Sequence, residues 1–381
     1  MTIEKSVAAS PETIQIAGAG PAGLAAAITL ARGGRKVVVH EAANEVGHRF
    51  GRDLQGLENW STHQDVLDWM QEQGLSTAFS HLPCRHGAAF DAWGECYQIG
   101  SADTLFYMVE RGPGEGSLDW ALAKKAREEG VEIRFNSRLK SMEGPGILAM
   151  GPRTADAIAV GYHFDTSMEN GFWVILDNNL APKGYSYLLV LEGRGTVKSC
   201  MFRDFKNESI YVERTVDAFK RLLNADMRNM KHHGGAGNLY LPNRAVSGIH
   251  PVVGEQAGFQ DCLWGFGMRY AMHSGILAAQ CLLNGKDFEA VWRQHYGALQ
   301  RRSIVNRMYY SLLGNRGYRW ALKLNRGRRI EVEQLLHRLY NPSIIGKLLY
   351  PWARLWVRSR RDDESCNHEN CACTWCRHGG H

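Results

Sequence analysis

The chain has 381 residues, of which 44% are hydrophobic and 22% are charged. This is ordinary globular usage, and no stretch approaches the roughly 20 apolar residues that span a bilayer, which excludes an integral membrane protein. The length predicts one two-lobed unit or two intimate domains. The sequence is polar until Ile14, which leaves no room for an apolar signal segment, and five cysteines are scattered singly. We therefore expect a cytoplasmic protein with reduced thiols.

The first predicted elements are a strand over residues 13–17, a glycine-rich turn and a helix over residues 24–31. The turn has the pattern Gly-x-Gly-x-x-Gly and comprises Gly18, Ala19, Gly20, Pro21, Ala22 and Gly23. Gly18 permits the tight turn, Gly20 lets the backbone approach a diphosphate, and Gly23 lets the helix pack closely on the strand. The N–H groups and the positive dipole end of the helix then face the phosphates. All six residues are predicted cofactor contacts.

A second buried strand over residues 36–40 ends at Glu41, 23 residues after Gly18. This spacing is typical of the acid that accepts hydrogen bonds from a ribose diol. A carboxylate here would repel a ribose 2′-phosphate, so the pattern favours FAD or NAD over NADP. We predict that Glu41 and the adjacent Ala42 contact the dinucleotide.

The middle of the chain predicts helices over residues 64–73 and 118–126 and a strand over residues 131–135. From about residue 155 to 240, β-branched and aromatic residues alternate, which predicts an antiparallel sheet. Aromatic side chains in this region are candidates for the wall of an apolar pocket or for ordinary core: Trp173, Tyr185 and Tyr187.

A second glycine-rich loop spans residues 251–268 and leads into a small-residue helix over residues 271–279. An acid at the end of its strand can hold ribityl or ribose hydroxyls, and its glycines let the backbone lie against a flavin ring. The helix would point its positive end at the pyrimidine part of that ring, where negative charge develops on reduction. The predicted contacts are Gly254, Glu255, Gly265, Phe266 and Gly267.

These two glycine clusters together resemble the geranylgeranyl reductase family, within the flavoproteins similar to para-hydroxybenzoate hydroxylase. The second motif of that family runs Gly-Asp-x-Ala-Gly and then Pro-x-x-Gly-x-Gly. Here Glu255 stands for the Asp, and Cys262 stands where the family has Pro. In relatives this loop lies near the reactive part of the ring, so Cys262 is either a redox partner of the flavin or a small buried cysteine.

Weaker similarities extend the resemblance along the chain. Residues 147–151 resemble the strand that returns to the FAD domain, and residues 182–187 resemble a Gly-Tyr-x-Trp strand over the substrate pocket. Where the family has Pro-Cys-Gly, this chain has His-Arg-Phe-Gly-Arg at residues 48–52, without the cysteine. Arg49 of this segment is a further predicted cofactor contact.

The resemblance implies an α/β fold with a Rossmann-like FAD-binding domain built on a parallel sheet. The antiparallel substrate domain is expected over residues 156–243, between the two parts of the FAD-binding domain, residues 1–155 and 244–300. Residues 301–361 are expected to form a basic helical segment, and residues 362–381 a Cys/His-rich tail. No second Gly-x-Gly-x-x-Gly follows a strand, so electrons would come from transiently bound NAD(P)H or from a carrier protein.

The net charge of +6 is unevenly distributed, because residues 301–361 contain 15 Lys and Arg against two acids. This segment alone carries +13, which indicates an anionic partner. Within it, five apolar residues share one helical stripe: Ile345, Leu348, Leu349, Trp352 and Trp356. Such a helix either lies in the interface of a membrane, peripheral to its inner face, or packs against the substrate domain. Nucleic acid is disfavoured, because no reading module is present.

The tail concentrates four thiols within eleven residues: Cys366, Cys371, Cys373 and Cys376. Close-set thiolates can converge on zinc, with His368 able to replace one of them, and an iron–sulfur cluster would use the same ligands. The spacing matches neither the usual zinc-ribbon pairs nor the common ferredoxin runs. A disordered, redox-active tail is the alternative.

The sequence thus predicts an FAD-dependent oxidoreductase that reduces carbon–carbon double bonds of an isoprenoid or other hydrophobic, lipid-like substrate. Two alternatives stay open. One is a monooxygenase that hydroxylates an aromatic compound or a protein side chain. The other is a flavin-binding accessory or electron-transfer protein that acts on a partner.

Overall fold

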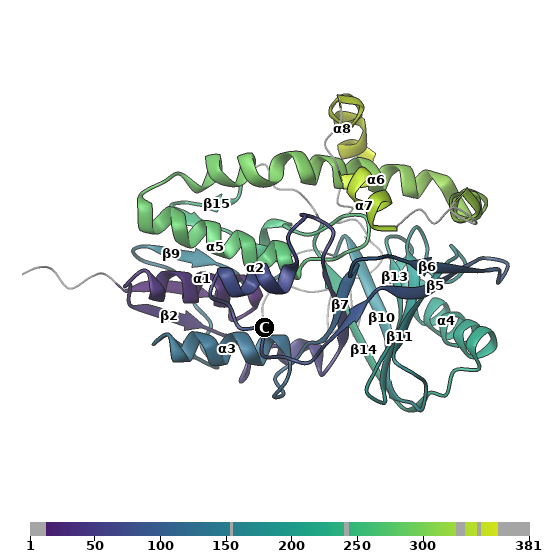
Figure 1. Ribbon diagram of the computed structural model, residues 1–381. Helices are drawn as coiled ribbons and strands as arrows, with labels where there is room; N and C mark the ends of the chain where they lie inside the picture. The colour runs from purple at the N-terminus through teal and green to yellow at the C-terminus, as the bar shows by residue number, and fades with distance from the viewer. Residues whose placement is uncertain (1–12, 153–154, 240–243, 325–331, 341–343, 357–381) are drawn as a thin grey trace, which may run out of the picture.

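The computed structural model describes residues 13–152, 155–239, 244–324, 332–340 and 344–356. Two lobes lie side by side, and a long helix, α6 (Phe288–Leu324), runs along both of them (Figure 1). The helix bends at Gly314, whose φ of 61° is not helical. The architecture is the predicted one, with a parallel-sheet lobe, a largely antiparallel lobe and a helical C-terminal segment.

The first lobe is built on a four-stranded parallel sheet in the order β8-β2-β1-β9. Its strands are β1 (Ile14–Ala17), β2 (Val37–His40), β8 (Glu132–Arg134) and β9 (Gly146–Leu148). The β-branched run Val37–Val39 is buried, as expected for a strand covered on both faces. Helix α1 (Pro21–Arg32) packs over this sheet, and α3 (Leu118–Glu128) and α5 (Met268–Asn284) pack against α1. A proline at the first turn starts α1, and the Ser117 hydroxyl caps α3 by accepting the N–H of Trp120.

The second lobe is a seven-stranded sheet in the order β14-β10-β13-β12-β11-β5-β6. Its strands are β5 (His86–Asp91), β6 (Cys96–Gly100), β10 (Ala157–Asp165), β11 (Gly171–Leu176), β12 (Tyr185–Leu191), β13 (Arg194–Met201) and β14 (Arg228–Gly237). All neighbours are antiparallel except β11 and β5. The sheet therefore extends beyond residues 156–243, because β5 and β6 add to its edge. Helix α4 (Glu208–Leu223) covers one face and buries Phe219 there.

A small three-stranded sheet in the order β3-β7-β4 connects the lobes (Figure 1). Its strands are β3 (Leu54–Glu58), β4 (His81–Cys84) and β7 (Phe106–Glu110). The Leu54 N–H donates to the Thr196 hydroxyl of β13 at 3.2 Å, which ties this sheet to the second lobe. The remaining short elements are α2 (Val66–Glu72), η1 (His48–Phe50), η2 (Phe205–Asn207), η3 (Gly254–Ala257), β15 (Val246–Ser247) and β16 (His250–Pro251).

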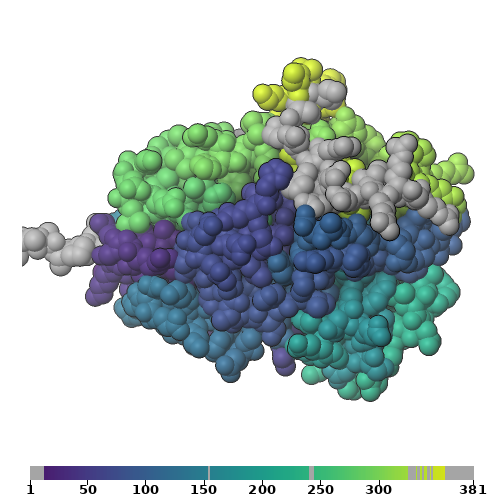
Figure 2. All heavy atoms as spheres, in the orientation of Figure 1, coloured from purple at the N-terminus to yellow at the C-terminus, as the bar shows by residue number. Residues whose placement is uncertain are grey.

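The C-terminal segment continues from α6 into α7 (Val332–Tyr340) and α8 (Ile344–Trp356). Helix α7 contributes Leu336 and Tyr340 to the core between the lobes, whereas α8 lies on α6 and protrudes from the surface (Figure 2). Within the described residues, no helix has the length and apolar content to cross a membrane.

Candidate flavin and substrate cavity

The three glycines of the first turn meet the steric demands that the sequence predicts. Gly18 has φ +105°, and a Cβ there would lie 2.3 Å from the carbonyl oxygen of Ala149. A Cβ at Gly23 would lie 2.0 Å from the carbonyl oxygen of Gly18, so a side chain would push α1 away from its strand. A Cβ at Gly20, by contrast, meets no protein atom within 4 Å, and Gly20 lines a cavity. A diphosphate would approach Gly20 from this open side of the turn.

Glu41 lies at the carboxyl end of β2, as the spacing predicts. Its carboxylate accepts the backbone N–H of Ala19 at 2.8 Å and that of Ala43 at 3.0 Å. These two bonds hold the acid beside the glycine turn, where its free lone pairs can accept ribose hydroxyls.

The second glycine loop folds directly against the first. Gly254 has φ +62°, and a Cβ there would lie 2.8 Å from the Cβ of Ala22. Its N–H donates to the Ser274 hydroxyl of α5 at 2.9 Å. Gly267 is the N-cap of α5, so the positive end of this helix lies at the loop. The two clusters thus form one wall, as a single dinucleotide requires.

A cavity of about 2770 Å³ runs from this wall into the second lobe. Drug-sized ligands occupy roughly 300–1,000 Å³, so this volume admits a dinucleotide and a second molecule together. The predicted cofactor residues that line it are Gly18, Ala19, Gly20, Pro21, Ala22, Glu41, Ala42, Arg49, Gly254, Glu255, Gly265, Phe266 and Gly267. The glycine cradle, the acid at β2 and the α5 N-terminus together fit FAD.

The other half of the cavity is walled by one face of the seven-stranded sheet and by α7. Alternate residues of β11 and β12 point into it, among them Tyr185 and Tyr187. Trp173 instead packs beside the cluster that includes Phe219. Apolar side chains make up most of this wall: Phe172, Val174, Leu176, Leu189, Val332, Leu335, Leu336 and Leu339. This half suits an extended apolar ligand.

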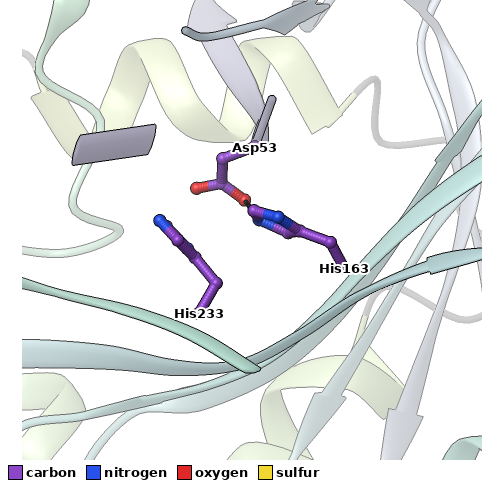
Figure 3. Close-up of side chains that lie close together, drawn as sticks. All are labelled: Asp53, His163 and His233. Atoms are coloured by element: carbon purple, nitrogen blue, oxygen red, sulfur yellow. Dashed lines mark hydrogen bonds and ion pairs between the residues drawn. The ribbon is translucent and has the colours of Figure 1, made fainter. Parts of the chain in front are cut away.

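One charged cluster interrupts the apolar wall, and the sequence patterns above did not identify it. The Asp53 carboxylate is buried and accepts from Lys198 Nζ at 2.7 Å and from His163 Nε2 at 3.0 Å (Figure 3 shows the aspartate and the histidines). Lys198 Nζ also lies 2.8 Å from His233 Nδ1. The available signal was Lys198 itself, a lysine in the middle of a predicted strand.

The arrangement of Asp53, His163 and His233 has the ligand types of a metal site, with donor atoms within 4.8 Å of one another. However, Lys198 Nζ already bonds two of the three residues, Asp53 and His233. Its ammonium therefore supplies the positive charge that a metal ion would bring, and an ion would have to displace it. The cluster fits an internal ion pair better than a metal centre.

The electrostatics of this cluster follow from burial and from its own charges. Burial opposes ionisation of Asp53, but Lys198 and the histidines together hold the pKa of the carboxyl well below its usual range. Burial lowers the pKa of Lys198, and the Asp53 charge opposes this shift. Burial and the Lys198 charge lower the pKa of His233 to about 4, so this imidazole is neutral at pH 7.

Cys262 lies outside the lining of the cavity, in a cluster with Ile304 and Val305 of α6. Its thiol is buried and lies 3.3 Å from the carbonyl oxygen of Leu239, and burial raises the pKa of this thiol. This placement favours the small buried cysteine over the redox partner. Another thiol, that of Cys200 on β13, does line the cavity, and burial raises its pKa to about 11.

The predicted metal ligands of the tail, Cys366, Cys371, Cys373 and Cys376 with His368 as a substitute, lie outside the described residues.

Comparisons with known proteins agree with this geometry. The model of the FAD binding domain family matches residues 12–146. A digeranylgeranylglycerophospholipid reductase from Haloferax volcanii is 24% identical over 312 residues, which cover 69% of this chain and 74% of that protein. A geranylgeranyl bacteriochlorophyll reductase-like structure from Thermoplasma acidophilum superposes with a TM-score of 0.66 and 16% identity, covering 91% of this chain and 99% of that one. The flavin-dependent brominase Bmp2 follows with a TM-score of 0.64, 15% identity and coverage of 92% and 100%.

Proposed function

We propose that this chain, an FAD-dependent oxidoreductase similar to the geranylgeranyl reductases, reduces carbon–carbon double bonds of an isoprenoid or other lipid-like substrate. The observation that carries the proposal is the continuity of the cavity. The same space that is lined by the glycine cradle is lined further on by aromatic and aliphatic side chains. A cofactor and an apolar chain can therefore lie end to end within it.

Bound and reduced FAD supplies a hydride to such a double bond. Gly20 and Glu41 would hold the dinucleotide, and the second glycine loop would hold its ring. Phe172, Tyr187 and Leu336 exclude water from the apolar half and hold the substrate by burying its surface. The electrons would reach FAD from NAD(P)H or from a carrier protein.

The direct test is anaerobic turnover of the purified, FAD-loaded protein. Dithionite-reduced protein is mixed with a panel of polyprenyl lipids, and mass spectrometry should find products that have gained two hydrogens as the flavin reoxidises. A Val174→Trp variant should bind FAD normally but lose turnover, because it fills the apolar half; Ile210→Trp, on the exposed side of α4, should behave as wild type. Reduced flavin that persists in the presence of every lipid, with no hydrogen gained, would contradict the proposal.

The same fold occurs in the brominase, so oxygen-dependent chemistry is the second candidate. Repeating the reaction in air separates the two candidates. A monooxygenase would yield a product heavier by one oxygen atom and no hydrogenated lipid. The third candidate, an accessory or electron-transfer protein, predicts that neither small-molecule product forms while a partner protein becomes reduced.

We propose further that α8 places the protein on an anionic membrane surface. Ile344, Leu348, Trp352 and Leu355 follow one another at helical spacing, and their exposed fractions are 77%, 71%, 73% and 66%. These side chains form the apolar row of a helix that protrudes from the molecule (Figure 2). The net charge of +13 over residues 301–361 complements anionic lipid headgroups.

The position of α7 connects the membrane contact of α8 with entry of the substrate. Helix α7 precedes α8 in the chain, and four of its residues line the apolar half of the cavity. A lipid-like substrate drawn from the bilayer would therefore meet the cavity wall close to the docking helix. The nearby cavity and the positive charge of the segment favour a lipid surface over a second copy of the chain as the partner of the apolar row.

Vesicle flotation tests the docking surface. The protein should float with vesicles that contain phosphatidylglycerol, float less with phosphatidylcholine alone, and lose binding in a Leu348→Ser/Trp352→Ser variant. Ile249→Ser, which removes an equally exposed apolar side chain elsewhere, should keep binding. Equal flotation of the α8 variant and wild type would overturn the proposal, and so would a dimer that disappears in the variant while vesicles bind neither protein.

A further inference from the structure

We propose that Lys198 is the proton donor of the reaction and that Asp53 and His233 are positioning residues that hold its ammonium group in the cavity. The inference rests on the proposed function, because reducing a double bond requires one proton in addition to one hydride. In the cavity wall, this cluster places a charged N–H donor beside the apolar half, with Asp53, Lys198 and His233 all lining the space.

The sheet register explains why the cluster forms. On β10, Gly161 faces Lys198 of β13 on one side and His233 of β14 on the other. A glycine has no side chain to separate them, so Lys198 Nζ and His233 Nδ1 meet at 2.8 Å across that strand. Asp53 lies in the connecting segment just before β3, and its carboxylate accepts a hydrogen bond from Lys198 Nζ at 2.7 Å.

The hydrogen bonds define which group carries each proton. His233 Nε2 lies 2.9 Å from the carbonyl oxygen of Arg49, which can only accept, so Nε2 carries the imidazole hydrogen. Nδ1 is therefore the acceptor, and Lys198 must donate to it. The ammonium has three N–H bonds, of which Asp53 and His233 take two. The third is available to a molecule in the cavity.

The cluster also lies where the two halves of the cavity meet. His233 is hydrogen-bonded to the carbonyl oxygen of Arg49. The side chain of Arg49 in turn pairs with Glu255 of the second glycine loop at 2.8 Å. On the other side, Lys198 faces Tyr187 of β12, which belongs to the apolar wall. A double bond held against the flavin end of the apolar half would lie beside the ammonium group.

Burial makes this ammonium group a better acid than an exposed lysine. Burial lowers the pKa of Lys198, whereas Asp53 keeps it protonated by opposing that shift. General acids are most effective when their pKa lies near the working pH. The Asp53 carboxylate thus favours the protonated form of Lys198, while burial makes its proton easier to release.

One carbon of the double bond would accept the hydride that the bound cofactor supplies, and the adjacent carbon would accept the proton as the Lys198 N–H bond breaks. Lys198 remains as a neutral amine between Asp53 and His233 and regains a proton from solvent when product leaves. The two electrons come from NAD(P)H or the reduced carrier, which is oxidised.

The substitution Lys198→Arg separates proton donation from simple positive charge, because guanidinium keeps its proton. Lys198→Arg should bind FAD and undergo dithionite reduction as wild type does, yet reoxidise with lipid about 100- to 10,000-fold more slowly. Lys220→Arg on the exposed side of α4 is the matched control. A second variant, Asp53→Asn/Lys198→Met, removes both charges without leaving one buried alone and should show the same loss.

A measurement on the flavin-free protein tests the cluster of Asp53, Lys198 and His233 itself. In the flavin-free protein, NMR should find His233 as the Nε2–H tautomer with a pKa of about 4, and Lys198→Met should raise that pKa, because Asp53 would then face it unopposed. Lipid turnover within threefold of wild type in Lys198→Arg, or an unchanged His233 titration in a folded Lys198→Met, overturns the inference. If wild type hydrogenates no lipid, the proposed function fails, and the titration alone decides whether the pairing exists.

Discussion

Arg49 and Glu255 are 206 residues apart in the chain, yet Arg49 Nη2 lies 2.8 Å from Glu255 Oε2. The pair joins the segment after the first cofactor unit to the second glycine loop. Both side chains are partly exposed, so the pair itself adds at most about 1 kcal/mol to folding stability. Its larger effect is positional, because it brings together two walls that a single dinucleotide must contact.

Gly18 and Gly20 should respond differently to alanine. Gly18→Ala should lower the free energy of unfolding by about 1–3 kcal/mol and abolish FAD uptake, because its φ is +105° and a Cβ would meet the Ala149 carbonyl oxygen. Gly20→Ala should fold within about 1 kcal/mol of wild type, since no protein atom lies within 4 Å of its Cβ, but should take up FAD poorly. Denaturant unfolding and flavin absorbance measure the two effects. Normal FAD uptake by Gly20→Ala would contradict the assigned diphosphate position.

Glu41→Gln should weaken FAD binding about 10- to 100-fold. The carboxylate accepts two backbone N–H groups at 2.8 and 3.0 Å, and hydrogen bonds to a charged group contribute about 1.5–3 kcal/mol. Fluorescence titration of the flavin-free protein measures the affinity. Glu132→Gln, in which the exposed pair with Arg134 is removed, should bind FAD as wild type does. Equal affinities for both variants would remove Glu41 from the site.

The protein should lose stability as the pH falls from about 6.5 to 4. His233 and His273 are held neutral by burial, and the pKa of each is lowered to about 4, so in this window the unfolded chain binds more protons than the folded one. Each histidine then contributes a slope of at most about 1.4 kcal/mol per pH unit, with stability rising with pH. Urea unfolding across this range measures the slope.

A His273→Phe variant should show a shallower slope than wild type, because one of the two half-buried imidazoles is gone. His48→Gln, on the surface, should leave it unchanged. A slope that does not respond to His273→Phe would show that this histidine is not buried neutral.

Cys262→Ser should retain FAD binding and turnover. The thiol contacts the Leu239 carbonyl oxygen and lies outside the cavity lining, so its loss should cost stability rather than chemistry. Flavin reduction and reoxidation rates within about twofold of wild type are expected. A specific loss of reoxidation, with the fold intact by circular dichroism, would restore Cys262 as a redox partner.

The cysteine tail is best tested by metal analysis. If Cys366, Cys371, Cys373 and Cys376 hold zinc or an iron–sulfur cluster, the full chain should carry metal and a chain that ends at Arg361 should not. Both forms should bind FAD equally. The same metal content in the two forms would leave the redox-active tail without metal as the interpretation.

The sequence by itself determined the dinucleotide half of this protein. The strand, the three glycines, the helix and Glu41 lie within 30 residues, and their spacing alone fixes how backbone N–H groups and one carboxylate face a ligand. Helical periodicity is local, so the sequence also predicted an apolar stripe on α8. The row that is exposed shares only Leu348 and Trp352 with the predicted stripe, and Leu349 packs against the cluster of Ile304 and Val305 on α6. Only the tertiary structure decided that the α8 row Ile344, Leu348, Trp352 and Leu355 faces outward.

The proton-donor cluster depended wholly on tertiary structure. Asp53 and Lys198 are 145 residues apart and meet where the Leu54 N–H at the start of β3 donates to Thr196 of β13, and His233 joins them because Gly161 stands between two paired strands. Likewise, β5 and β6 add to the edge of a sheet whose other strands begin more than 50 residues later. Local propensity predicts that strands form, but strand order and register follow from how distant apolar faces are buried together, which no single segment encodes.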